Sequence, residues 1–139
     1  MSQGLSNTAI ASVLNHIFAT GTYTKPTGLK LHLYKGDPHS GGAEVDNVVD
    51  DTAYASAAIT FGDEGAIEPN RVHNDDFISF MPVTYGSGGA SYDVTHWAVK
   101  DGSGTLLAAG AFPTAITRLA GEPMGMAPGA LFIELTRTA

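Results

Sequence analysis

A β-hairpin is predicted over residues 94–112, and it constrains the fold more than any other stretch of the chain. Residues 94–99 alternate between two faces, with Trp97, the only tryptophan, on the face opposite Val94 and His96. A second apolar run follows the sequence Asp-Gly-Ser-Gly at 101–104, and an Asp-Gly pair between two such runs is a strong hairpin signal. The hairpin therefore favours a β-fold in which the other segments pair with it or pack on it.

Other segments repeat this alternation in short runs separated by glycine, proline and polar residues. These runs are 29–34, 54–61, 77–81, 114–119 and 131–136. Strands this short, in a chain with 17 glycines and 7 prolines, favour an all-β sandwich or barrel over an α/β fold. We predict an antiparallel β-sandwich of about seven or eight short strands. The expected core anchors are Trp97, Phe61, Phe80 and Ile133.

One helix is predicted, over about residues 6–20 at the N-terminal end. Apolar residues share one face of it, namely Ile10, Val13, Leu14, Ile17 and Phe18. Ser6 or Asn7 can cap its start, and Gly21 suits the left-handed position after its end. A single apolar stripe means that the helix lies against something, either its own sheet or a neighbouring subunit.

Composition narrows the classes of protein that this chain can belong to. Its 139 residues fit one domain, 1–139, and the absence of cysteine excludes disulfides and Cys-based zinc sites. A formal charge of -7, from 14 acidic and 7 basic residues, argues against nucleic acid or an anionic membrane as the main partner. No apolar run is long enough to cross a bilayer, and the first residues lack the basic region of a signal peptide.

No catalytic, cofactor-binding or metal-binding residues are predicted. None of the five histidines (His16, His32, His39, His73 and His96) pairs with another at a spacing typical of metal ligands. The cluster His73-Asn74-Asp75-Asp76 lacks the EF-hand pattern and fits a solvated turn better than a calcium site. No serine lies in a G-x-S-x-G elbow, and the Gly/Ser tract at 86–89 lacks the lysine of a phosphate-binding loop. A carboxylate pair for glycoside hydrolysis stays open, because any two acidic residues can meet in space.

Two polar stretches are expected at the surface. The segment 44–51 carries four acidic residues and is interpreted as an exposed loop or short edge segment. The Gly/Ser tract between Tyr85 and Tyr92 is interpreted as a flexible surface loop. Together with Tyr23, these tyrosines form a candidate contact surface, since tyrosine is enriched where proteins touch. The alternative is that they are ordinary loop residues, half-buried under their own chain.

The order of the motifs along the chain resembles a family of small tailed-bacteriophage virion proteins, labelled phage tail fibre or head-decoration proteins. The matching segments are the strand 29–34 followed by Gly36-Asp37-Pro38, then GGAEV at 41–45, 54–61, Ile78-Ser79-Phe80, HWAVKD at 96–101, LLAAG at 106–110 and PGALFIEL at 128–135. The resemblance extends from the helix to the end of the chain. It departs from the family pattern in the acidic insertion at 47–52 and at 124–126.

This resemblance implies a non-enzymatic structural protein that is made in the host cytoplasm and built into the virion. A compact decoration, or cement, protein on the capsid surface is the first expectation, and a tail fibre or tail-tip component is the alternative. Its partners would be the major capsid protein or tail proteins, without nucleic acid or membrane. A homo-oligomer, with three-fold symmetry as the first expectation, fits both placements. A further hypothesis is recognition of host surface glycan through Trp97 or the 85–92 loop, and an enzyme such as a cell-wall hydrolase is the least favoured.

Overall fold

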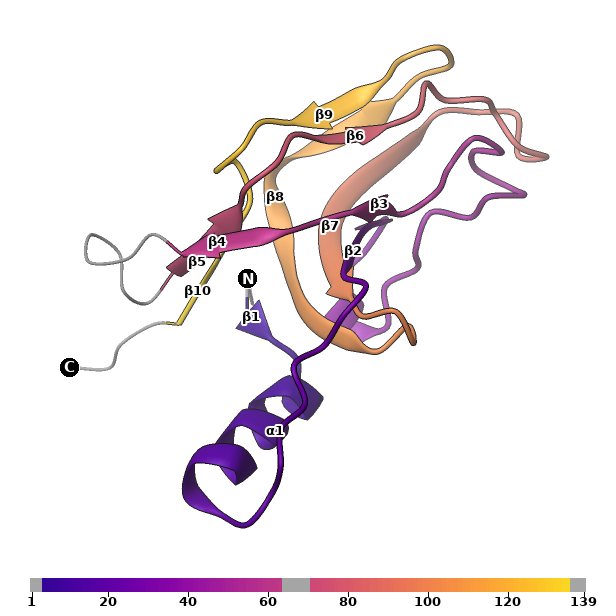
Figure 1. Cartoon of the computed structure of the whole chain (residues 1–139). Helices are drawn as coiled ribbons and strands as arrows, with labels where there is room; N and C mark the ends of the chain where they lie inside the picture. Colours follow the sequence, from indigo (N-terminus) through magenta and orange to yellow (C-terminus); the bar gives the residue numbers. More distant parts are fainter. Residues whose placement is uncertain (1–3, 64–70, 136–139) are drawn as a thin grey trace.

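The computed structural model describes residues 4–63 and 71–135, in which the chain is mostly antiparallel β-structure with one α-helix near the N-terminus (Figure 1). The helix is α1 (Asn7–Phe18), and a short 3-10 helix, η1, spans Pro38–Ser40. The strands are β1 (Gly4–Leu5), β2 (Lys30–Tyr34), β3 (Ala57–Ala58), β4 (Phe61–Asp63), β5 (Arg71–Asn74), β6 (Ile78–Phe80), β7 (Tyr92–Lys100), β8 (Leu106–Arg118), β9 (Met124–Met126) and β10 (Phe132–Glu134). The predicted fold class is confirmed, although the described residues form 10 strands, more than the expected about seven or eight.

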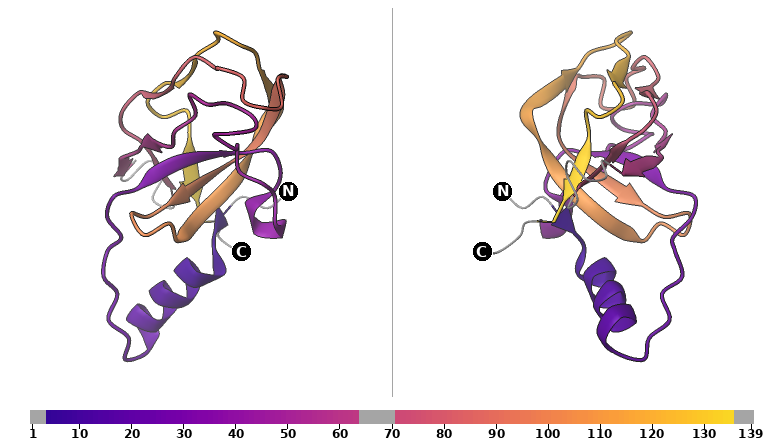
Figure 2. Two further views of the ribbon diagram at one scale, coloured as in Figure 1. Left: turned by 90° about the vertical axis from the view of Figure 1, so that its right-hand side faces the viewer. Right: turned by 60° about the vertical axis from the view of Figure 1, so that its left-hand side comes forward.

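The strands form three sheets. The largest has the strand order β1-β8-β7-β2-β3, and the smaller ones are β10-β5-β4 and β6-β9. The smaller sheets face the large one, and α1 projects from one end of this sandwich-like body (Figures 1 and 2). No helix of the described residues is long and apolar enough to cross a membrane.

The predicted hairpin is confirmed as the pair β7–β8 at the centre of the large sheet. Its turn is organised by Asp101, whose Oδ1 accepts backbone hydrogen bonds from Ser103 and Thr105, each at 2.9 Å. Gly104 has a φ of +84°, in the left-handed region that favours glycine. The aspartate and the second glycine of the Asp-Gly-Ser-Gly sequence therefore close the hairpin.

An irregularity in this hairpin changes which residues share a face. The pairing moves from Val94 opposite Ile116 to His96 opposite Ala111, so residues 112–115 of β8 lie opposite Thr95 alone. Val94 and Trp97 consequently lie in the same core cluster. The expectation that they occupy opposite faces is wrong, because an irregular step interrupts the two-residue period.

The main core lies between the large sheet and the two small sheets. Leu31, Leu33 and Val94 are fully buried there. Among the expected anchors, Trp97 and Phe80 are buried in this cluster, whereas Phe61 and Ile133 are partly buried and pack against it. The fully buried apolar side chains of this core thus come from the large sheet, and residues of the small sheets and loops cover them.

Several strand boundaries differ from those expected. The segment 114–119 is not a separate strand, because β8 continues through Pro113, which lies in the irregular step where no ladder donor is needed. The expected strand 54–61 is divided into β3 and the start of β4. The terminal strand is shortened to β10, and residue 136 lies outside the described residues.

Strand β9 is not among the strands expected from the sequence, and it pairs with β6. Its centre is Gly125, where a Cβ atom would lie 2.4 Å from Cζ of Phe77. Glycine therefore allows the Phe77 ring to cover this strand. A three-residue strand of glycine and methionine has no alternation to reveal it in the sequence.

Helix α1 begins as predicted but ends differently. The Ser6 side chain caps it by accepting a hydrogen bond from the backbone N–H of Ala9, at 3.2 Å. The helix ends at Phe18, and the C-cap residue Ala19 is extended, so the expected left-handed cap at Gly21 is wrong. Gly21 instead lies close to the helix, where a Cβ atom would be 3.0 Å from that of Asn15.

Candidate interaction surfaces

The apolar stripe of α1 is largely uncovered. We define the α1 ridge as the four apolar side chains exposed on the helix, Ile10 (41%), Leu14 (50%), Ile17 (60%) and Phe18 (80%). Only Ala9 of the helix is buried, because α1 touches the body mainly at its N-terminal end, near β8. The exposure of the ridge increases toward the helix end that lies farthest from the body (Figure 1).

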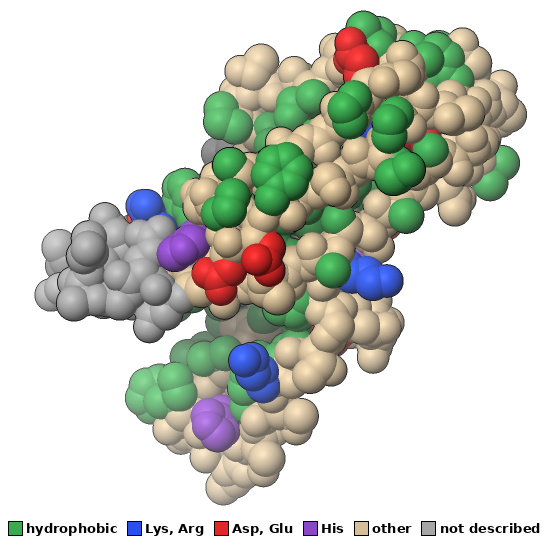
Figure 3. Space-filling model, turned by 45° about the horizontal axis from the view of Figure 1, so that its top comes forward, with side chains coloured by type: hydrophobic (Ala, Val, Ile, Leu, Met, Phe, Trp, Pro, Cys, Tyr) green, Lys and Arg blue, Asp and Glu red, His purple; other side chains and the backbone are tan. Residues whose placement is uncertain are grey.

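A groove lies between α1 and the β-body. We define the α1 groove by its lining residues, Leu5, Ala9, Val13, Tyr23, Lys25, Pro26, Leu29, Phe61, Val72, Val99, Leu107, Ala108 and Ile133. Its volume is about 380 Å³, and its lining is almost entirely apolar. In Figure 3 it is the hollow between the β-body and the projecting part of the molecule that contains α1. Ridge and groove together form an apolar region at one end of the molecule.

A polar cluster centred on Glu44 lies on the large sheet. Oε1 of Glu44 is 2.5 Å from Nδ1 of His32 and accepts a hydrogen bond from the Tyr54 hydroxyl at 2.8 Å. Oε2 accepts a hydrogen bond from Nζ of Lys100 at 3.2 Å. The ammonium group of Lys100 also lies 5.2 Å from the centre of the Tyr34 ring. These contacts join β2, β7 and the loop after η1.

The electrostatics of this cluster indicate a structural role. Burial alone would raise the pKa of Glu44, but the hydrogen bonds from His32, Tyr54 and Lys100 outweigh it and lower that pKa to about 2. Burial, together with the neighbouring Glu44 carboxylate, raises the pKa of Tyr54. A general acid or base needs a pKa near the working pH, so these two groups are displaced in the wrong directions for proton transfer.

The cluster borders a polar hollow of about 500 Å³, lined by Glu44, Val45, Asp46, Asn47, Tyr54, Ala55 and Ser56. Both oxygens of Glu44 are already engaged by side chains of its own fold. The carboxylate is therefore occupied in tying strands together.

The acidic segment 44–51 is not a uniformly solvated face, which corrects the expectation. Val45 lies in the main core, and the Asp51 side chain is buried. Asp46 and Asp50 close the loop through hydrogen bonds with its own backbone N–H groups. Asp50 also forms a 2.6 Å ion pair with Lys35. The acids therefore organise the loop and attach it to the sheet.

Tyr92 is buried and does not contribute to a contact surface, contrary to expectation. Its hydroxyl donates a hydrogen bond to Oδ2 of Asp51 at 2.9 Å. Burial and this carboxylate raise its pKa to about 12, although Arg118 acts in the opposite direction. Oδ1 of Asp51 accepts the backbone N–H groups of Ala53 and Thr84, so one buried carboxylate fastens three segments.

The Gly/Ser tract is not a loose loop either. Gly86, Ser87 and Gly88 donate backbone hydrogen bonds to carbonyl groups of residues 48–50, at 2.8–3.1 Å. A Cβ atom on Gly86 would lie 2.2 Å from the Val48 carbonyl oxygen, so glycine is required by close backbone approach. The tract forms a fixed layer over the acidic loop.

The structure does not bring the three candidate tyrosines together. Tyr23 lines the α1 groove, and its backbone N–H donates to Nδ1 of His16 at 3.3 Å. Tyr85 is half-buried in the loop between β6 and β7, and that loop lies at the other end of the molecule from α1 (Figure 1). Of the three, Tyr23 is the one that belongs to an apolar surface.

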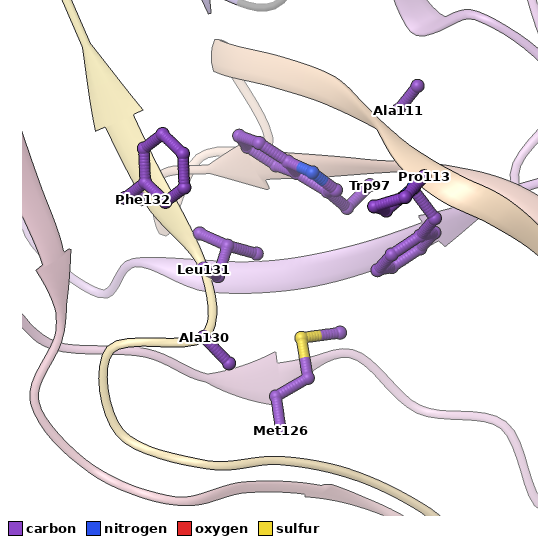
Figure 4. A pocket seen from close by; sticks show the side chains of 8 residues that line it. Trp97, Ala111, Pro113, Met126, Ala130, Leu131 and Phe132 are labelled. Carbon is purple, nitrogen blue, oxygen red and sulfur yellow. The ribbon is translucent and has the colours of Figure 1, made fainter.

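Trp97 lines an apolar pocket of about 150 Å³ inside the body. The other lining residues are Ala111, Phe112, Pro113, Met126, Ala130, Leu131 and Phe132 (Figure 4). The indole lies across the pocket from Leu131, and only 4% of Trp97 is exposed. Trp97 is therefore a core residue and cannot present an aromatic platform to a glycan.

The histidines occupy separate places. Those outside the Glu44 cluster include His96, which is buried with Nδ1 2.7 Å from Oγ1 of Thr95, and His73, whose Nε2 lies 3.8 Å from Asp75. His39 lies in η1 beside its N-cap residue, Asp37. In residues 4–63 and 71–135, no group of three or more His, Asp or Glu side chains is arranged to hold a metal ion.

Residues 4–134 match the family of the podophage GP4 fiber I protein gp80. The chain belongs to this family. The gp80 match covers α1 and the strands from β1 to β10, and it confirms the resemblance to tailed-phage virion proteins. No curated protein matches the chain. Membership of the gp80 family gives the chain the general character of a phage fibre-type virion protein.

Proposed function

We propose that this protein is a non-enzymatic structural component of a phage virion, acting as a homo-oligomer that contacts other virion proteins. The observation that carries the proposal is the gp80 family match over nearly the whole chain. The ridge and groove at the α1 end add physical support, because contiguous exposed apolar surface on a soluble protein typically marks an interface.

The polar chemistry of the described residues supports a structural role. The carboxylates of Glu44 and Asp51 accept hydrogen bonds from side chains of their own fold, and these bonds hold loops against the large sheet. A carboxylate used for acid–base catalysis would instead have a pKa raised toward neutrality and a position open to substrate. The pKa of Glu44 is lowered instead, and the Asp51 side chain is buried beneath its own loop.

We propose a place in a fibre of the particle, since gp80 is described as a fiber protein. The alternative is a decoration protein spread over the capsid, in contact with the major capsid protein. The two placements differ in copy number and in position on the particle. Both fit a compact β-body with one exposed apolar end.

Gold-labelled antibody on intact virions tests the proposal. We expect gold label on the fibres. As a control, antibody that has first been adsorbed with the purified protein should no longer label the virions. Label spread evenly over the capsid would support decoration and contradict the fibre placement. Purified virions that contain no copy of the chain, as judged by gel and mass spectrometry, would contradict any structural role in the particle.

A further inference from the structure

We propose that the α1 ridge of each copy docks into the α1 groove of a neighbouring copy, forming a closed homo-oligomer. This inference rests on the proposed role as a homo-oligomeric virion component and identifies the interface. The occupant of the groove is a second copy of this chain, and the inserted part is the last turn of its helix, with Leu14, Ile17 and Phe18.

The volumes fit this assignment. One turn of an α-helix with its side chains, roughly 10 Å wide and about 5 Å long, occupies about the volume of the groove. The groove measures about 380 Å³ and therefore accepts one turn of helix, but not the whole of α1. The last turn bears the most exposed side chains of the ridge.

The area argues for ridge-in-groove contact over ridge-on-ridge contact. The four ridge side chains expose an apolar surface on the order of 400 Å², within the range of functional patches. A specific interface buries about 800 Å² on each partner, roughly twice as much. Two ridges facing each other would bury only about half of this area, whereas a copy that contributes both a ridge and a groove buries more than a ridge alone.

The charges also favour a second copy of this chain as the occupant of the groove. Helix α1 contains no Asp, Glu, Lys or Arg, so copies with a formal charge of -7 can approach at this surface without placing like charges face to face. Lys25 carries the only charge among the described residues that line the groove. The carboxyl end of a helix has a partial negative charge, so the inserted last turn would lie favourably beside Lys25.

The mass of the protein in solution tests whether the ridge makes the interface. By light scattering, we expect the wild-type chain to be an oligomer at about 100 µM. Ile17→Glu should raise the dissociation constant at least about 100-fold, because it places a charge in an apolar contact. Val72→Glu in the groove wall should have a similar effect, whereas Met81→Glu, at a residue that is 67% exposed outside ridge and groove, should leave the mass unchanged.

Circular dichroism and thermal melting of each variant keep the test interpretable. Ile17 is mostly exposed, so Ile17→Glu should retain the fold while losing the oligomer. A wild-type monomer at this concentration would overturn the proposal, and so would a folded Ile17→Glu variant with the wild-type mass.

Cysteine pairs test the groove itself, because the chain has no native cysteine. Chains with Ile17→Cys and chains with Val72→Cys, carrying tags of different mass, are co-expressed and oxidised mildly. We expect mixed disulfide pairs on a non-reducing gel, and Met81→Cys should not form them with Ile17→Cys. Predominant pairing of Ile17→Cys with itself would overturn docking into the groove. These results are separate from gold labelling, which can place the protein on the virion whichever surface joins its copies.

Discussion

Single residues of the acidic loop show how a polar side chain can carry part of the fold. Glu44 receives hydrogen bonds from residues 12, 10 and 56 positions away in the sequence. Asp51 accepts a hydrogen bond from the hydroxyl of Tyr92, which is 41 positions away. Each of these carboxylates satisfies several donors at once, and removing it would leave buried donors without an acceptor.

The Glu44 cluster predicts a specific pH dependence. The pKa of Glu44 is lowered in the folded state from 4.5 to about 2, so its contribution to stability is complete above pH 4.5 and is lost as the pH falls toward 2. We expect Glu44→Gln to lower the free energy of unfolding at pH 7 by roughly 1–2 kcal/mol, after allowing for solvent screening. Urea denaturation between pH 2 and pH 7 measures both effects.

Glu122→Gln is the matched control, because Glu122 is exposed. It should keep the wild-type pH profile. If the free energy of unfolding of Glu44→Gln varied with pH as that of the wild-type chain does, the carboxylate would not stabilise the folded state.

The sequence could not reveal these roles. The four acids at 44–51 suggest a solvated face, because acidic clusters usually are solvated. Glu44 and Asp51 have partners distant in the sequence, such as Lys100 and Tyr92, so no local pattern distinguishes Asp51 from an exposed neighbour. The same holds for Tyr92, which the flanking Gly/Ser tract makes look like a surface residue.

At the scale of elements, the strongest local patterns predicted the structure best. The β7–β8 hairpin, the strand β2 and the helix start at Ser6 all follow from periodicity, turn chemistry and capping. The irregular step opposite Thr95 and the strand β9 could not be predicted, because each depends on pairing with a distant segment. The sequence also left open whether α1 lies against its own sheet or a neighbouring subunit, since periodicity identifies an apolar face but not what covers it.

The loop after β6 gives a prediction at this scale. Gly86→Ala should destabilise the protein by about 1–3 kcal/mol, because the added Cβ would meet the backbone of Val48 and Val49. Ser87→Ala, at the next residue, keeps the backbone hydrogen bond to Val48 and should change stability by less than about 0.5 kcal/mol. Chemical denaturation of both variants makes the comparison, and equal stability would contradict close packing of this loop on the acidic segment.

For the whole molecule, stability and association are expected to be coupled. If the α1 ends of neighbouring copies join, the folded oligomer is favoured by mass action and the melting temperature depends on protein concentration. We expect the melting temperature of the wild-type chain to rise by several degrees across a hundredfold increase in concentration. Scanning calorimetry of Ile17→Glu should show no such rise, and a concentration-independent wild-type melt would contradict the coupling.

The position of α1 in the chain also has a mechanical consequence. The helix is preceded by β1, which pairs with β8, and followed along the chain by β2, which pairs with β7. A tensile load that enters through α1 would therefore reach both strands of the central hairpin, and α1 lies beyond the turn end of that hairpin (Figure 1). Pulled along their length, antiparallel strands resist in shear, because their hydrogen bonds lie across the strands and bear the load together. In the proposed oligomer, the helix that joins one copy to the next would thus pass its load to both strands of the central hairpin.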